Sequence, residues 1–152
     1  MTREGESGVE GASADGEGLA VLAREMARFG NERDAPARSV MAMLGDRWTT
    51  LILLVLAQRP TRHADLKRAL ERLSHEKAIS QRVLTLKLRA LERDGFVVRE
   101  VSGDVPPRVS YRLSPQGEDL ARQARAMIDW INLRSEAIRA AREAYDAADT
   151  PD

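Results

Sequence analysis

Residues 78–117 read AISQRVLTLKLRALERDGFVVREVSGDVPPRVSYRLSPQG, and this stretch decides the fold. Ser80 stands where an N-cap side chain would accept a hydrogen bond from a free backbone N–H. Three leucines follow at helical spacing, at Leu84, Leu88 and Leu91. Such spacing predicts one apolar stripe along an amphipathic helix. Gly95 after Asp94 is a typical stop signal, so we expect a helix that begins at Ser80 and ends near Gly95.

The residues after Gly95 have the composition of two short strands. Phe96, Val97, Val98 and Val101 show the β-branched and aromatic bias of a strand. The chain then turns through residues 102–107, and Val109, Tyr111 and Leu113 alternate with polar residues as in a half-buried return strand. A helix followed by such a hairpin predicts a mainly α (α+β) fold, a winged helix-turn-helix with a two-stranded wing.

The side of this helix away from the leucines carries side chains that can reach base edges: Ser80, Gln81, Arg82, Thr85, Leu86 and Arg89. Arginine can fork onto guanine, glutamine onto adenine, and a threonine methyl can meet the thymine methyl in the major groove. A merely solvated helix face would look similar. Arg108, expected at the hairpin tip, favours double-stranded DNA as the partner, because a basic wing suits phosphates or the minor groove.

Charge is unevenly distributed although the formal net charge is zero. Residues 1–18 hold five acids against Arg3, with five glycines and little to bury, so we expect an acidic disordered tail. Residues 59–112 hold thirteen basic against seven acidic side chains, a local excess of plus six. A phosphate backbone would respond to this local field and not to the total.

Length and composition predict one domain. A chain of 152 residues with 43% hydrophobic side chains can bury one core. We expect a winged-helix domain over residues 19–146 that includes N- and C-terminal dimerisation helices, and a disordered tail over 147–152. The longest apolar run is too short for a bilayer, so we expect no membrane partner and a cytoplasmic, nucleoid-associated protein.

The sequence offers little for chemistry at a catalytic or metal centre. The absence of cysteine removes disulfides, thiolate zinc ligands and thiol switches. His63 and His75 are far apart for a metal site, and no nucleophile–base pair or glycine-rich phosphate loop is evident. We therefore expect no enzyme, no cofactor and no metal.

Apolar periodicity predicts further helices around the winged helix. The first carries Leu19, Leu22, Met26 and Phe29 on one face, and the second begins near Pro36. Residues 48–57 are apolar nearly all round and predict a central core helix. Thr61 is expected to cap the next helix, the first member of the helix-turn-helix.

Ser114 and Pro115 open a last helix that we expect to continue to about Tyr145. About 30 residues would span roughly 45 Å, more than one small domain can cover, although the helix could also lie on its own core. The better explanation is a homodimer. The residues expected at its interface are Leu22, Met26, Phe29, Leu120, Ala124, Met127, Ile131 and Ile138. Trp48 and Trp130 are candidates for a ligand pocket.

Four blocks together resemble the HxlR family of bacterial winged-helix transcriptional regulators, relatives of the MarR group. They are residues 44–53 with Gly45-Asp46-Arg47-Trp48, residues 79–95, residues 106–111 and residues 113–117. The resemblance implies a homodimer that presents two recognition helices to a pseudopalindromic operator.

Four features depart from that family pattern. Ala35-Pro36 replaces a common Cys-Pro, which excludes the thiol-based sensing of some members. His63 replaces a common aromatic residue, and the link from Leu70 to Ile79 is longer than usual. Leu86, at a normally polar position, could contact thymine methyls or weaken base reading.

The leading hypothesis is therefore a sequence-specific, homodimeric DNA-binding transcriptional regulator controlled by a small-molecule effector and not by thiol oxidation. The alternative is a winged-helix adaptor that binds a protein through the same face.

Overall fold

The computed structural model describes residues 10–74 and 78–149, with side chains from residue 16 onward. The chain divides into two compact units, Met1–Met43 and Leu44–Asp152. Within the described residues, no single helix has the length and apolar composition needed to cross a membrane. In the same part of the chain, only the bent pair of helices α2 (Pro36–Leu44) and α3 (Thr49–Leu56), taken together, has that length and composition.

The first unit contains α1 (Glu10–Phe29) and most of α2 (Pro36–Leu44). The expected first helix is confirmed, and its four apolar side chains are all exposed, from 45% for Met26 to 68% for Leu19. Gly30 follows with a φ of 91°, the left-handed conformation that often ends a helix.

The predicted disordered tail was too long. Helix α1 already begins at Glu10, and only residues 1–9 of the predicted 1–18 segment lie outside the described residues. Ala12, Ala14 and Ala20 have high helix propensity, which offsets the interspersed glycines. At the other end, α7 reaches Ala148, so residues 147–148 of the predicted tail are helical.

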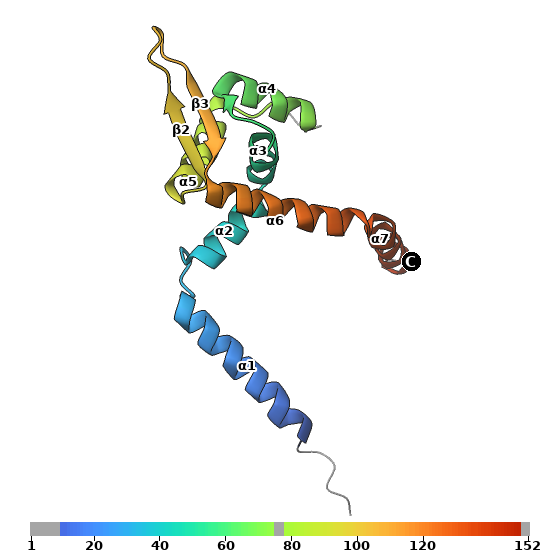
Figure 1. Cartoon of the computed structure of the whole chain (residues 1–152). Coiled ribbons are helices and arrows are strands. Elements are labelled where there is room, and N and C mark those ends of the chain that lie inside the picture. Colours follow the sequence, from blue (N-terminus) through green and yellow to red (C-terminus); the bar gives the residue numbers. More distant parts are fainter. Residues whose placement is uncertain (1–9, 75–77, 150–152) are drawn as a thin grey trace, which may run out of the picture. The chain divides into compact units, whose positions relative to one another are not determined.

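The second unit holds the winged helix (Figure 1). Its elements are α3 (Thr49–Leu56), β1 (Thr61–Arg62), α4 (His63–Leu73), α5 (Gln81–Arg93), β2 (Val97–Val101), β3 (Val109–Leu113), α6 (Pro115–Asn132) and α7 (Ser135–Ala148). Helix α3 packs against α4, α6 and β3, while α5 packs against β2. The core therefore lies between α3, the helix-turn-helix and the inner ends of the strands.

The central apolar helix is confirmed, although it begins one residue later than expected because Trp48 is its N-cap. Ile52 and Leu53 of α3 are fully buried. They share the core with the leucines of the two helix-turn-helix members, Leu66, Leu70, Leu84, Leu88 and Leu91. Each buried leucine removes enough apolar surface from water to contribute about 1.5–3 kcal/mol.

The predicted two-stranded wing is confirmed as the hairpin of β2 and β3, and a short β1 extends the antiparallel sheet to the order β1–β3–β2. The third strand comes from Thr61, which pairs with Tyr111 in place of capping α4. The Thr61 hydroxyl donates to the Arg59 carbonyl at 2.9 Å, and α4 has Arg62 at its N-cap without a side-chain cap. Two residues were too few to show strand alternation in the sequence.

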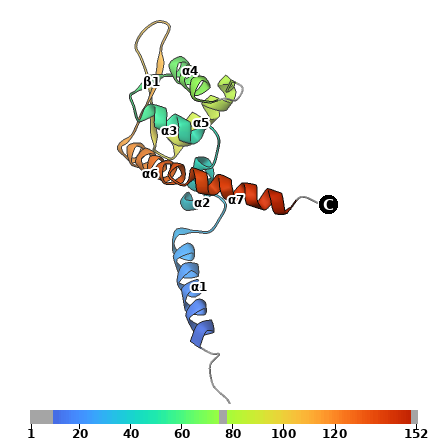
Figure 2. The same ribbon diagram turned by 90° about the vertical axis from the view of Figure 1, so that its right-hand side faces the viewer.

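The predicted single long C-terminal helix is wrong. Helix α6 ends at Asn132, residues 133–134 form a turn, and α7 runs in a different direction (Figures 1 and 2). The Arg134 N–H donates to the Ile131 carbonyl at 2.9 Å. This bond spans three residues, as in a 3₁₀ turn, whereas an α-helical bond spans four. Apolar spacing continues through this turn, which is why periodicity alone suggested one helix.

Candidate nucleic-acid interface

Helix α5 begins as its sequence predicts. The Ser80 hydroxyl accepts a hydrogen bond from the Val83 N–H at 3.1 Å, a side-chain N-cap. Leu84, Leu88 and Leu91 are at most 1% exposed. The buried stripe fixes the rotation of α5 about its axis, so its polar side faces outward.

The predicted base-reading residues lie on or beside this outward side. Gln81, Arg82 and Arg89 are exposed, and Leu86 is 52% exposed. Thr85 is half-buried on the flank next to the hairpin. At about 3.6 residues per turn, Arg82, Leu86 and Arg89 lie opposite the leucines.

Sequence reasoning missed one cation on this side. Arg93, in the last turn of α5, is exposed and lies seven residues after Leu86, on the same face. The signal was available in the spacing alone, since positions seven apart share a helix face.

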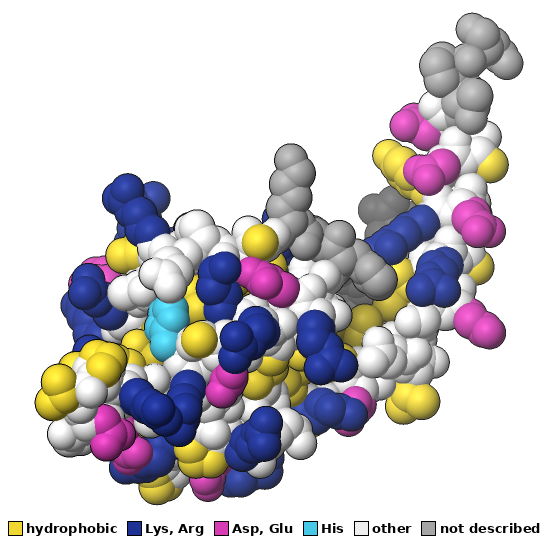
Figure 3. All heavy atoms as spheres, turned by 90° about the horizontal axis from the view of Figure 1, so that it is seen from above, with side chains coloured by type: hydrophobic (Ala, Val, Ile, Leu, Met, Phe, Trp, Pro, Cys, Tyr) yellow, Lys and Arg dark blue, Asp and Glu magenta, His cyan; other side chains and the backbone are white. Residues whose placement is uncertain are grey.

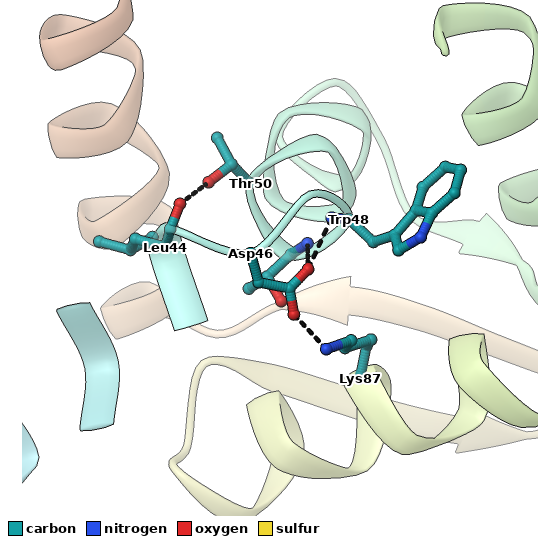
Figure 4. A network of polar contacts seen from close by, with 6 residues as sticks. Leu44, Asp46, Trp48, Thr50 and Lys87 are labelled. Atoms are coloured by element: carbon teal, nitrogen blue, oxygen red, sulfur yellow. Dashed lines mark hydrogen bonds and ion pairs between the residues drawn. The ribbon is translucent and has the colours of Figure 1, made fainter. Parts of the chain in front are cut away.

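The other flank of α5 is tied to the turn before α3 by a polar network (Figure 4). Lys87 forms an ion pair with Asp46. The other oxygen of Asp46 accepts the Trp48 N–H at 2.7 Å and the Thr49 N–H at 3.2 Å. These bonds satisfy backbone donors at the start of α3 and fix the distance between α3 and α5.

The ionised form of Asp46 is favoured by this network. Burial works against its charge, but the hydrogen bond from Lys87, the two backbone N–H groups and the Lys87 charge outweigh it and lower the pKa of Asp46 below its ordinary value.

Arg108 lies at the base of the hairpin loop and not at its tip, which corrects the sequence expectation. Its N–H donates to the Ser102 hydroxyl at 2.9 Å, and its carbonyl accepts the Ser102 N–H at 2.9 Å. Residues 103–107 extend beyond this pair. The Arg108 side chain is exposed and remains available to a partner beside the wing.

A hollow of about 450 Å³ lies beside the contact of α5 with the hairpin. Its lining comes from four elements: His63, Thr85, Arg89, Glu92, Arg99, Val109 and Tyr111. Arg99 pairs in register with Tyr111, so both side chains lie on the sheet face that also carries the buried Val97. From the sequence alone, strand alternation could have predicted that Arg99 lies on the sheet face next to α5. The position of His63 beside the hairpin could be found only from the tertiary structure.

His63 lies at the edge of this hollow, half-buried, with its ring centroid 6.1 Å from that of Tyr111. Burial and then the charge of Lys67 lower the pKa of His63 below its ordinary value. Seen from above, lysine and arginine side chains lie on several sides of the cyan histidine (Figure 3). Among the described residues, no group of three metal-ligating side chains is close enough to hold an ion.

The residues expected at a dimer interface divide into three groups by their exposure. Leu22, Phe29 and Met127 are more than half exposed and Ile131 is 42% exposed, whereas Leu120 and Ile138 are half-buried. Ala124 is 7% exposed, and with Ala121 and Gly117 it forms the buried face of α6, which packs on α3. Ala124 is therefore covered by its own chain, which corrects its assignment to an interface.

The two tryptophans proposed for a ligand pocket lie in different surroundings. Trp48 is half-buried at the start of α3, whereas Trp130 is 52% exposed. The guanidinium of Arg134 lies over the Trp130 ring at 3.9 Å from its centroid. Neither tryptophan lines the hollow beside α5, and their joint role stays a prediction.

Taken together, a capped helix with a polar and basic outward side, a preceding helix and a flanking hairpin define a winged helix-turn-helix of the DNA-binding type. The comparisons with known proteins agree. Residues 43–138 match the family described as HxlR-like helix-turn-helix. The chain belongs to this family of transcriptional regulators.

Individual relatives support the same assignment. The chain is 36% identical over 108 residues to the uncharacterized HTH-type transcriptional regulator YtfH of Escherichia coli, covering 71% of this chain and 81% of that protein. The solved structure of the YtfH regulator from Salmonella typhimurium is similar with a TM-score of 0.62 at 36% identity, covering 75% of this chain and 98% of that one. The redox regulator HypR in its reduced form is similar with a TM-score of 0.59 at 30% identity, over 69% and 98% of the two chains.

Proposed function

We propose that this protein is a homodimeric regulator that binds a pseudopalindromic operator and reads its sequence through α5. The observation that carries the proposal is the outward side of α5, where Arg82 and Arg89 are exposed beside Thr85 and the buried leucines fix their direction. One such helix fits the major groove. Two copies related by a twofold axis would meet half-sites roughly 34 Å apart.

Dimerisation is supported by apolar surface that one chain leaves uncovered. Met127, Trp130 and Ile131 of α6 are between 42% and 58% exposed, and Leu133 in the following turn is 86% exposed. Soluble monomers rarely leave large contiguous apolar patches open. Burial against a second copy would remove this surface from water.

We further propose that a small molecule, and not thiol oxidation, controls DNA binding. The 152 residues contain no cysteine, so no thiolate is present to react. Trp48 and Trp130 remain our candidates for contacting the effector. A hollow of about 490 Å³ bounded by α3, β3 and α6 offers space for a small molecule, with Leu54, Arg59 and Arg125 in its lining, although neither tryptophan lines it.

A binding-site selection on random DNA, followed by titrations at several salt concentrations, tests the proposed function. We expect an enriched inverted repeat and an affinity that falls steeply with salt, because phosphate contacts release counterions. The exposed Leu86 favours one second candidate, a protein-binding adaptor. Salt-insensitive binding to a protein, with no enriched DNA site, would support that adaptor and contradict DNA reading.

A further inference from the structure

We propose that the hollow between α5 and the hairpin binds a DNA backbone phosphate, and that His63 takes up a proton when the phosphate binds. This inference rests on the proposed function and deepens it, because it makes DNA binding by the wing side of the protein dependent on pH.

The hollow lies where groove geometry would place a DNA backbone strand. If α5 lies in the major groove and the hairpin follows the adjacent minor groove, the sugar-phosphate strand between the two grooves must pass between α5 and the hairpin. The hollow opens at that place, with Thr85 and Arg89 from α5 on one side and Arg99 and Val109 from the hairpin on the other.

The charges of the hollow suit a single phosphodiester. Arg89 and Arg99 come from different elements, and neither has an ion-pair partner in the part of the chain that the structure describes. Glu92 in the same lining offsets one of these charges. A protonated His63 would restore the second positive charge, and its N–H groups could donate to phosphate oxygens.

The surroundings of His63 explain why the proton arrives with the DNA. Burial and then the charge of Lys67 on its own helix disfavour the charged imidazole. The cations Arg89 and Arg99 and the acid Glu92 line the same hollow. The pKa of His63 is accordingly lowered in the free protein. A phosphate in the hollow would raise it again, and a group whose pKa rises on binding binds a proton in the same step.

The test is DNA affinity as a function of pH, measured by fluorescence anisotropy with a random-sequence duplex of about 30 base pairs carrying a pH-insensitive cyanine dye. Random DNA suffices because phosphate contacts are independent of sequence. At constant ionic strength, we expect wild-type affinity to rise as pH falls below about 6.5, by up to tenfold per pH unit for each proton bound. Calorimetric titrations in two buffers of different ionisation enthalpy should report proton uptake directly.

Two variants with matched controls locate the effect. His63→Gln should flatten the pH dependence, whereas His75→Gln, which removes the other histidine of the chain, should leave it in place. Arg99→Gln should weaken binding more than Arg112→Gln does. The control Arg112→Gln removes the same charge from the same hairpin. Arg112, however, lies on the opposite sheet face, where it pairs with Glu100 at 2.6 Å.

Three results would overturn the inference: an unchanged pH dependence in folded His63→Gln, no proton uptake by the wild type, or equal losses for Arg99→Gln and Arg112→Gln. If the wild type binds DNA with a steep salt dependence in any of these cases, only the proposed phosphate site in the hollow is wrong, and the proposed function stands. If the wild type does not bind DNA at all, the proposed function itself fails.

Discussion

Gly117 is the residue at which α6 lies against the backbone of Phe96, just before the hairpin. A Cβ atom added there would lie 1.9 Å from the Phe96 carbonyl oxygen, which also accepts the Ser114 N–H at 3.0 Å. Backbone atoms cannot move aside as a flexible side chain can, so only glycine fits in this first turn of α6.

We therefore expect Gly117→Ala to lower the free energy of unfolding by about 1–3 kcal/mol through overpacking. Gln116→Ala, at the exposed neighbouring position, should change it by less than about 0.5 kcal/mol. Urea denaturation of both variants measures the difference. Equal stabilities would mean that the contact between α6 and Phe96 is looser than the structure shows.

Asp46 gives the stability of the protein a defined dependence on pH. Because its pKa is lower in the folded state than the ordinary value of 3.8, its contribution is fully present above that value and is lost as pH falls through the folded pKa. Asp46→Asn should lower stability at neutral pH by about 1–3 kcal/mol, since charge-assisted hydrogen bonds are lost.

The deficit of Asp46→Asn should shrink below pH 3.8, where the wild-type carboxyl also becomes neutral. Asp119→Asn is the control, because Asp119 pairs with Arg122 on the surface with both side chains at least 67% exposed. Thermal melts across acidic pH supply the measurement. A deficit that stays constant down to the acid limit would show that ionisation of Asp46 is not the cause.

At the residue scale, local features were predictable and tertiary ones were not. The caps at Ser80 and Ser114 follow from residue type and position, and both hydroxyls accept the expected N–H. The pairing of Thr61 with Tyr111 and the location of His63 depend on chain segments about 50 residues apart. No local pattern carries that information.

At the element scale, the hairpin should contribute affinity without specificity. Arg108 is exposed at the base of the loop, where it can reach a phosphate or the minor groove. We expect Arg108→Ala to weaken binding to all duplexes similarly and to reduce the slope of log K against log salt by about one. Titrations of two unrelated duplexes at several salt concentrations test this. An unchanged slope would place Arg108 away from the DNA.

The elements themselves were largely predictable from periodicity and end signals. α5, α6 and both hairpin strands begin near the residues that the sequence indicates. The division of the C-terminal segment into α6 and α7 was missed, because the residues at the turn, Leu133 and Arg134, are ordinary helix formers. The short β1 strand was missed because it is defined only by its partner.

At the scale of the whole molecule, the exposed apolar side of α6 determines assembly in our account. Met127→Glu together with Ile131→Glu should yield folded monomers, since a buried unpaired charge costs far more than lost packing. Met127→Leu with Ile131→Leu keeps the surface apolar and should remain dimeric. Light scattering distinguishes the two variants. A glutamate variant that stays dimeric would show that the interface is not on α6, and the face of α1 that carries Leu22 and Met26 would become the next candidate.

Base reading by α5 is tested by the ratio of the protein's affinities for the selected operator and for random DNA. In Arg82→Ala and Thr85→Ala, we expect the operator to lose about 1–3 kcal/mol of binding free energy while random DNA loses less, so that the ratio falls by roughly tenfold or more. Equal losses on the two DNAs would contradict base reading, because they would show that Arg82 and Thr85 contact only the backbone.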